Sequence, residues 1–118
     1  MFQKIFLIIF LILILHSCSK KNDIDYEPKD KLNAYKLYQE GFDAFQKGDY
    51  FFANKKFTEA ELNFEKVEFA AKSAIMSSFS LYGINFYSES LTNLERYLKK
   101  YPADKNVVYA HYLIALIH

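Results

Sequence analysis

The side chains best suited to catalysis or metal binding are few and far apart. The sequence has three histidines, His16, His111 and His118. His111 and His118 share one face of a predicted helix but lie two turns apart, about 10 Å by helix rise, which is too far to share a metal ion without other ligands. The only cysteine is Cys18, and the sequence has neither a glycine-rich phosphate-binding loop nor a nucleophile motif. We therefore expect no enzymatic activity, no metal site and no cofactor.

A group of glutamates comes closest to a pair of catalytic carboxylates. Glu61 and Glu65 are one helical turn apart, and Glu59 and Glu68 flank them. Four lysines alternate with these glutamates, namely Lys55, Lys56, Lys66 and Lys72. We interpret the mixed segment as a solvated, charged helix face.

The first residues have the pattern of a secretory signal. Lys4 supplies a positive charge, and Ile5 to Leu15 is an uninterrupted apolar run. A membrane-spanning helix needs about 20 such residues, so this shorter run predicts the apolar core of a cleaved signal peptide over residues 1–17.

A covalent modification is predicted at Cys18. The residues Leu15-His16-Ser17-Cys18 resemble the bacterial lipobox, although His16 is unusual at its position. The resemblance implies that Cys18 becomes the mature N-terminus and bears several acyl chains, which together hold a protein stably on a membrane. By resemblance to enterobacterial lipoproteins, the non-acidic residue Ser19 is compatible with export to the outer membrane. The alternative is an ordinary signal peptide followed by an incidental cysteine.

The segment after the cysteine predicts a flexible tether. Residues 19–31 are polar and mix both signs of charge, and Pro28 disfavours helix at Glu27. We assign residues 18–31 to the tether and residues 32–118 to the folded domain.

Two helices folded back on each other begin the domain. Apolar residues recur at three- and four-residue steps on both sides of a turn: Tyr35, Tyr38, Phe42 and Phe45 before it, and Tyr50, Ala53, Phe57, Ala60 and Phe64 after it. In the turn, Gly48 suits a left-handed helix end and Asp49 can cap the next helix. Gly41, in the middle of the first helix, predicts close approach of the second.

The same residue types return 37 positions later. Gly41 maps onto Ser78 and then Ala115, and Gly48 maps onto Asn85. The further matches are Phe42 with Phe79, Phe45 with Tyr82, Tyr50 with Tyr87, Ala53 with Ser90, and Phe57 with Leu94. Helix-turn-helix units of about this length are typical of tetratricopeptide (TPR) repeats.

We therefore predict an all-α fold of about two and a half TPR-like helix-turn-helix repeats forming a short superhelical solenoid. The repeats fall near 34–67 and 71–102, with an incomplete one at 108–118. The predicted helices are 32–47, 49–66, 68–83, 87–101 and a fifth that starts at Asp104, with its body at 107–118. The alternative is a plain helical bundle in which the similarity at a spacing of 37 residues arises by chance. The last helix lacks a polar cap, which suggests the front part of a longer protein.

Charge and composition narrow the function. Fifteen basic residues face 14 acidic ones, for a net charge of +1. Removal of Lys4 with the signal would leave the mature chain neutral, which argues against nucleic-acid binding. The 19% aromatic content predicts either a well-filled core or an aromatic groove.

The repeat register predicts which aromatic residues would line such a groove. The first helix of each TPR pair lies on the concave side. The inward positions are then Tyr35, Tyr38, Phe42 and Phe45, with Ile75, Phe79 and Tyr82, and with Tyr109 and Tyr112; Lys72 and Leu116 fall on the same side. This surface would suit an extended peptide with alternating aromatic residues. The alternative, that these rings fill the core between repeats, is expected for about half of them.

The lipobox, the tether and the aromatic repeats together resemble the BamD family, the TPR lipoproteins of the outer-membrane β-barrel assembly machinery. The segments with this similarity are residues 37–41, 55–61, 74–76, 94–102 and 109–113. The resemblance implies a non-enzymatic scaffold on the periplasmic face of the outer membrane. It implies as partners a BamA-like barrel protein, sister lipoproteins and the C-terminal segments of unfolded outer-membrane proteins. Family members have about five repeats, and the later ones dock on BamA.

Two other functions stay open from the residues. One is a different periplasmic TPR lipoprotein that acts as an adaptor in cell-envelope or cell-division machinery. The other is a small lipoprotein with a ligand pocket or hydrolase role between its repeats.

Overall fold

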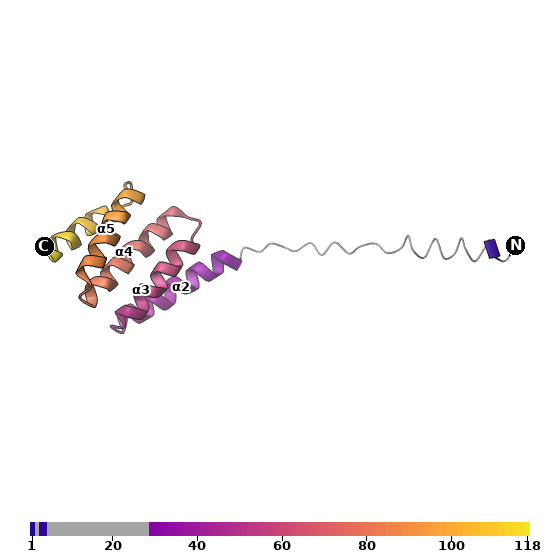
Figure 1. Cartoon of the computed structure of the whole chain (residues 1–118), viewed down its shortest axis with the longest axis horizontal. Coiled ribbons are helices and arrows are strands. Elements are labelled where there is room, and N and C mark those ends of the chain that lie inside the picture. Colours follow the sequence, from indigo (N-terminus) through magenta and orange to yellow (C-terminus); the bar gives the residue numbers. More distant parts are fainter. Residues whose placement is uncertain (2, 5–28) are drawn as a thin grey trace.

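Antiparallel helices form the folded part of the chain. The computed structural model describes residues 1, 3–4 and 29–118. Five helices lie between residues 29 and 118: α2 (Lys29–Gln46), α3 (Tyr50–Asn63), α4 (Val67–Gly83), α5 (Tyr87–Lys100) and α6 (Val107–Ile117). Each packs on the next, as Figure 1 shows, which confirms the all-α, TPR-like prediction. No helix of the described ranges combines the length and apolarity needed to cross a membrane. Most of the predicted signal peptide, Cys18 and most of the predicted tether lie outside the described residues.

Three helix boundaries differ from the prediction by three residues, two of them in the first repeat. α2 begins at Lys29, directly after Pro28 in the sequence, so three residues assigned to the tether are helical. α3 ends at Asn63 instead of Lys66, because Phe64 adopts an extended backbone with φ −75° and ψ 126°. Leaving the helix lets the Phe64 ring pack against Tyr35, with ring centroids 5.1 Å apart, and against Phe69 at 5.5 Å.

The turns form as the sequence predicts. Gly48 has φ +78°, and the Asp49 carboxylate accepts a hydrogen bond from the backbone N–H of Phe52 at 3.2 Å. Asn85, the repeat partner of Gly48, is also left-handed, with φ 63°. Both hairpins therefore turn through the same backbone conformation at equivalent positions.

Gly41 allows the first two helices to touch. A Cβ atom at Gly41 would lie 3.0 Å from the Phe57 ring and 3.2 Å from Cβ of Lys56. Phe57 is fully buried and cannot easily retreat. The predicted close approach of α3 at this glycine is confirmed.

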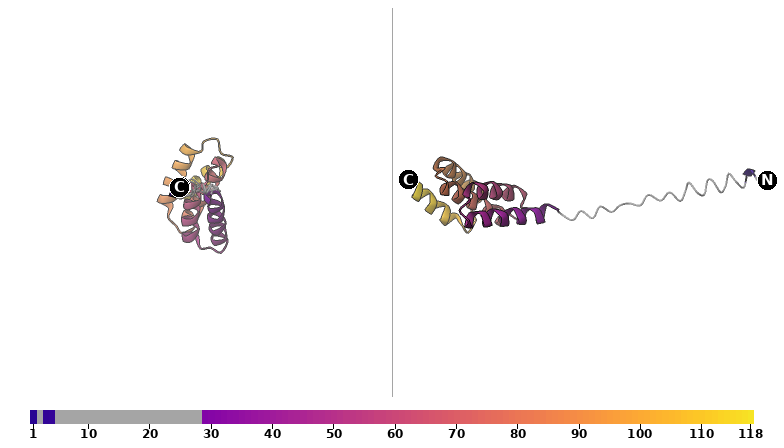
Figure 2. Two further views of the ribbon diagram at one scale, coloured as in Figure 1. Left: turned by 90° about the vertical axis from the view of Figure 1, so that its right-hand side faces the viewer. Right: turned by 90° about the horizontal axis from the view of Figure 1, so that it is seen from below.

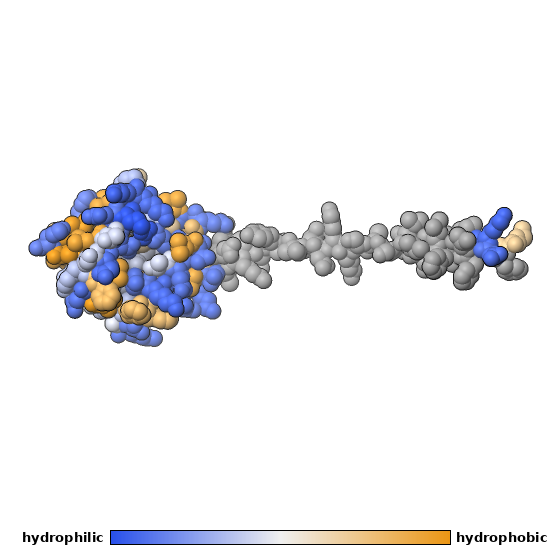
Figure 3. Space-filling view, in the orientation of Figure 1, coloured by the Kyte–Doolittle hydropathy of each residue, from blue (hydrophilic) through white to orange (hydrophobic). Residues whose placement is uncertain are grey.

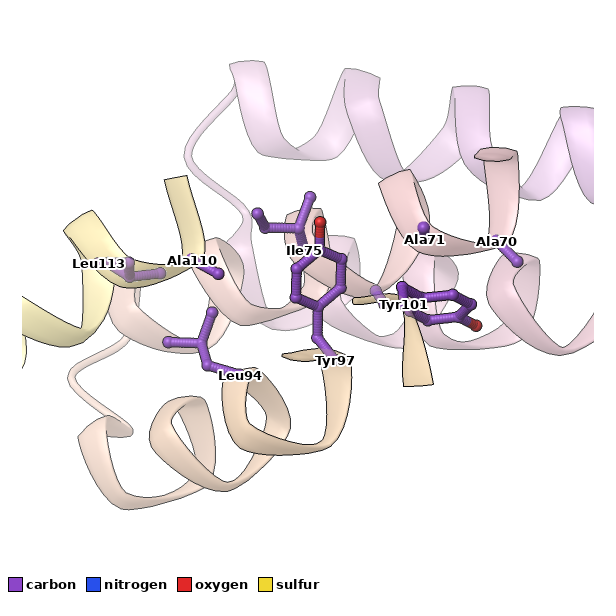
Figure 4. Packing of buried hydrophobic residues seen from close by; sticks show 9 residues of the cluster. Ala70, Ala71, Ile75, Leu94, Tyr97, Tyr101, Ala110 and Leu113 are labelled. Carbon is purple, nitrogen blue, oxygen red and sulfur yellow. The ribbon is translucent and has the colours of Figure 1, made fainter. Parts of the chain in front are cut away.

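α4 is the central helix of the array and packs on both α3 and α5. Small side chains cover much of its surface, and Ser73, Ala74 and Ser78 are fully buried. A larger core joins α4 to α5 and α6, and in Figure 4 Leu94 and Tyr97 of α5 point toward Ile75. A smaller core around Phe57 joins α2 to α3.

Glu61 connects the two repeats and corrects one prediction. The prediction of a solvated face is wrong for this residue, which is only 5% exposed. Its two carboxylate oxygens accept one hydrogen bond each from Arg96 Nη1 and Nη2, both at 2.7 Å. Tyr101 Oη donates to it at 2.8 Å, and Lys100 Nζ lies 3.4 Å away. Glu61 follows Phe57 by four residues and precedes Phe64 by three, so its place in the apolar period was the signal for burial.

The start of α6 is fixed by a second carboxylate. Asp104 was predicted to begin the helix, but α6 begins at Val107. The Asp104 carboxylate accepts hydrogen bonds from Tyr97 Oη at 2.5 Å and from the Asn106 N–H at 3.0 Å. Burial and this acidic partner raise the pKa of Tyr97. The α5–α6 connection is thereby held against the core of the second repeat.

We expect Glu61→Gln to destabilise the fold. The amide cannot accept the charge-assisted bonds from Arg96 as strongly, and such bonds contribute about 2 kcal/mol. Urea unfolding followed by circular dichroism would show the loss. Glu59→Gln is the matched control, since Glu59 is more exposed and its ion pair with Lys56 is long, at 3.9 Å. Equal midpoints for the two variants would contradict the role given to Glu61.

The stabilisation by Glu61 should depend on pH. Burial alone would raise its pKa, but the bonds from Arg96 and Tyr101 and the nearby cations outweigh burial, so its pKa lies below the ordinary value of 4.5. On acidification the unfolded chain takes up the proton first, which lowers the free energy of unfolding. The advantage of the native chain over Glu61→Gln should be constant above about pH 5 and shrink below it. A constant difference down to pH 3 would contradict this account.

Candidate protein-binding surfaces

The aromatic residues predicted for a groove come from the first helix of each repeat. These helices, α2, α4 and α6, are separated in sequence by α3 and α5. In the right-hand view of Figure 2, α2 and α6 lie towards one side of the array and α5 towards the other. α4 and α6 are in direct contact. The array therefore has a first-helix side, formed by α2, α4 and α6.

On α2, three of the predicted rings surround the buried Phe57. Tyr38, Phe42 and Phe45 are all half-buried and pack against this core. The ring centroid of Tyr38 is 5.3 Å from that of Phe57, and Phe45 is 6.5 Å from it. Phe42 stacks on Tyr38 at 6.4 Å. Each ring thus supports the first repeat with one part and presents the other to solvent.

Tyr35 is the most exposed of the α2 rings, at 47%. Tyr35 makes edge contacts with Phe64 and Phe69, with ring centroids 5.1 and 5.3 Å away, so the ring is held in place by the end of α3 and the first turn of α4. Lys72 on α4 places its ammonium 5.4 Å from the centroid of Tyr38 and links the two helices. Burial raises the pKa of the Tyr38 phenol, which therefore stays protonated at neutral pH.

The three α4 residues are mostly core. Ile75 is 4% exposed and belongs to the buried cluster in Figure 4, which removes it from any groove in this structure. Phe79 and Tyr82 are half-buried against the same cluster. The Tyr82 ring also contacts Tyr87 of α5 at 5.4 Å. At this helix the repeat register predicted the side of the helix but not the degree of burial.

The two α6 residues are open to solvent. Tyr109 is 55% exposed and Tyr112 is 59% exposed, and Leu116 beside them is 47% exposed. Figure 3 shows strongly hydrophobic surface over this helix. Of the nine predicted groove residues, the structure leaves three well exposed, Tyr35, Tyr109 and Tyr112.

A polar hollow between α3, α4 and α5 was not predicted. Its volume is about 380 Å³, and its lining includes Asn54, Thr58, Ser77, Asn93 and Arg96. Ser77 Oγ donates to Asn54 Oδ1 at 2.6 Å, and Asn93 Nδ2 donates to Ser78 Oγ at 2.9 Å. The sequence signal for this hollow was a polar residue within the apolar period of each helix.

This hollow lacks the groups needed for nucleophilic catalysis. The acceptor for the Ser77 hydroxyl is an amide oxygen, which is too weak a base to activate it. The Arg96 guanidinium already pairs with Glu61 and Asn93. Among the residues that the structure describes, no cluster of three or more histidine, cysteine or acidic side chains could hold a metal ion. The surfaces described are suited to binding by contact.

Comparison with known proteins agrees with the expected resemblance. The outer membrane lipoprotein family YfiO matches residues 30–118. The chain is 29% identical over 82 residues to the outer membrane protein assembly factor BamD of Caulobacter vibrioides, covering 70% of this chain and 27% of that protein. It is 26% identical over 117 residues to the BamD of Neisseria meningitidis serogroup A, covering 98% of this chain and 44% of that protein.

The chain thus spans less than half the length of these two relatives. No solved structure matches it significantly. The match to the family extends over all five helices that contribute the surfaces described above. The chain belongs to the YfiO family of outer membrane lipoproteins.

Proposed function

We propose that this chain is a non-enzymatic, lipid-anchored scaffold in the assembly of outer-membrane β-barrel proteins. The family match over residues 30–118 supports this role, as does the name of both relatives, outer membrane protein assembly factor. The proposed place of work is the periplasmic face of the outer membrane. A BamA-like barrel protein and sister lipoproteins are the proposed partners within the assembly machinery.

The proposed client is an extended segment of an unfolded outer-membrane protein that contains aromatic residues. The observation that supports it is the exposure of three tyrosines on helices of the first-helix side: Tyr35, Tyr109 and Tyr112. Tyrosine offers a large apolar face together with a hydroxyl, and it loses little conformational freedom on binding. The half-buried Phe42 and Phe79 would add apolar contact between them.

The tyrosines of α6 give the sharpest test of client binding. A photoreactive phenylalanine analogue in place of Tyr109 or Tyr112 should crosslink in membranes to the C-terminal segments of unfolded barrel proteins. The same analogue in place of Phe51 is the control, because Phe51 is 68% exposed but lies on α3. Mass spectrometry of the crosslinked peptides identifies the partner.

Three results of this experiment would be informative. Client capture at α6 and not at Phe51 supports the proposal. Capture of the BamA-like protein alone would be consistent with the assembly role, and would make the first-helix side a docking surface between subunits. Capture of neither by a folded, membrane-bound chain would contradict the proposal and favour an adaptor in other envelope machinery.

The anchor is tested separately. Cys18→Ala should leave the chain without its acyl chains and with its signal peptide uncleaved, so that it is absent from the outer-membrane fraction of a density gradient. Ser19→Ala preserves the cysteine and should float like the native chain. Retention of Cys18→Ala by membranes after cleavage of the signal would refute lipidation as the means of attachment.

A further inference from the structure

One edge of the helical array concentrates the exposed aliphatic side chains. Among residues 33–118, the four most exposed large apolar side chains are Leu62 at 77%, Val108 at 70%, and Phe51 and Val67 at 68% each. Leu62 is in the last turn of α3, Val67 is the first residue of α4 and Val108 is the second residue of α6. The three aliphatic residues of this set therefore lie where helices end or begin on one side, which we call the link edge. In Figure 1 it contains the start of α2 and the α3–α4 and α5–α6 links.

A shallow apolar hollow lies in the link edge. It has a volume of about 410 Å³ and is lined by Val67, Pro102 and Ala103 together with Lys100 and Lys105. The charges that line it are balanced, because the lining contains two acidic residues, Glu68 and Asp104, and two lysines. Lys105 pairs with Glu68 at 3.0 Å, and Lys100 lies 3.4 Å from Glu61. Asp104, which also lines the hollow, accepts from Tyr97. The surface therefore offers apolar contact with a polar rim and little net charge.

The point of attachment indicates what could cover this edge. The chain reaches the described helices at Lys29, the start of α2, which belongs to the link edge. Eleven residue steps separate Lys29 from Cys18, so the two are at most about 40 Å apart. The opposite edge is farther from Cys18 along the chain by the length of α2, which has 18 residues and is about 27 Å long. If Cys18 is lipidated, the short connection holds the link edge at high effective concentration beside the bilayer.

We propose that the link edge rests on the lipid bilayer, with Leu62, Val67 and Val108 at the boundary between headgroups and acyl chains. This inference rests on the proposed lipidation of Cys18. Apolar side chains favour that boundary, and the lysine stems at the rim can lie along it with their ammonium groups in the headgroup layer. Because the acidic and basic charges of the rim are equal in number, contact depends on the aliphatic side chains and needs no excess of anionic lipid. The contact would orient the array, with the α2–α3 and α4–α5 turns pointing away from the membrane.

The rival surface is the opposite edge, which exposes aromatic residues. Phe51 is 68% exposed, and Phe86 and Tyr87 at the α4–α5 turn are 46% and 43% exposed. Aromatic side chains also favour membrane interfaces. The two edges can be compared directly because the sequence has no tryptophan, so a single introduced one reports its own surroundings.

The experiment places one tryptophan at a time in the full chain, as purified from membranes and reconstituted into vesicles of phosphatidylethanolamine and phosphatidylglycerol. Val67→Trp and Val108→Trp probe the link edge, and Phe51→Trp is the matched control with the same 68% exposure as Val67. All three positions are more than two-thirds exposed, so helical content and unfolding midpoint should stay those of the native chain. Lipids brominated along the acyl chain serve as quenchers.

We expect quenching by brominated lipid at least twofold stronger for Trp at 67 and 108 than at 51, with a blue-shifted emission that persists at high salt. Equal or stronger quenching at position 51 would overturn the proposal in favour of the opposite edge. Absence of quenching at all three positions in a lipidated chain would also overturn it. A blue shift at 67 that requires an added BamA-like protein, without lipid quenching, would assign the edge to a protein partner instead.

The mass of the Cys18 peptide separates this proposal from the anchor on which it rests. An unlipidated Cys18 would refute the proposed anchor. The same variants, coupled through Cys18 to a phospholipid with a maleimide headgroup, would then test the edge by the same quenching criterion. Cys18 is the only cysteine in the sequence, so the coupling is specific.

Discussion

The ion pair between Glu61 and Arg96 fixes how the first repeat meets the second. A repeat array has contacts only between neighbours, so the angle between two units depends on the side chains that cross from one to the next. Glu61 on α3 accepts hydrogen bonds from Arg96 on α5 and from Tyr101 directly after α5. Removing a carboxylate from water is costly, and the cost is offset only when its partners are well placed. The bond pattern therefore constrains α3 and α5 to one relative position.

That position leaves α4 between two neighbours, and small side chains make this possible. Ser73, Ala74 and Ser78 are fully buried, so α3 and α5 approach the backbone of α4 closely. Three of the four serine hydroxyls in this helix, all but that of Ser77, donate to carbonyls one turn earlier, as Ser78 Oγ does to Ala74 at 3.1 Å. Asn93 reaches in from α5 to the same region. The polar layer and the ion pair are continuous, because Arg96 also donates to Asn93 Oδ1 at 2.7 Å.

Local chemistry was predictable from the sequence, and burial was less so. Gly48, Asn85 and Asp49 act in the turns as their residue types require, and the similarity at a spacing of 37 residues predicted the repeat. The alternation of glutamates and lysines predicted Glu61 at the surface, whereas its position in the apolar period places it in the core. The repeat register also equates Ile75 with Tyr112. Ile75 is buried because Leu94, Tyr97, Ala110 and Leu113 cover it, while Tyr112 is 59% exposed. Equivalent positions differ because burial depends on neighbours along the array.

The rings of the first-helix side also explain how binding could occur without a deep pocket. Tyr35 is held by Phe64 and Phe69, and Tyr38 by Phe57 and Phe42, so each ring is ordered before any partner arrives. Ordering a side chain at an interface costs about 0.5–1.5 kcal/mol, and rings already packed on one another avoid much of that cost. Their exposed area is nevertheless modest, and each contact would be weak. A surface of several weak, preorganised contacts suits an extended segment that must be held and then released, since loss of one or two contacts is enough to free it.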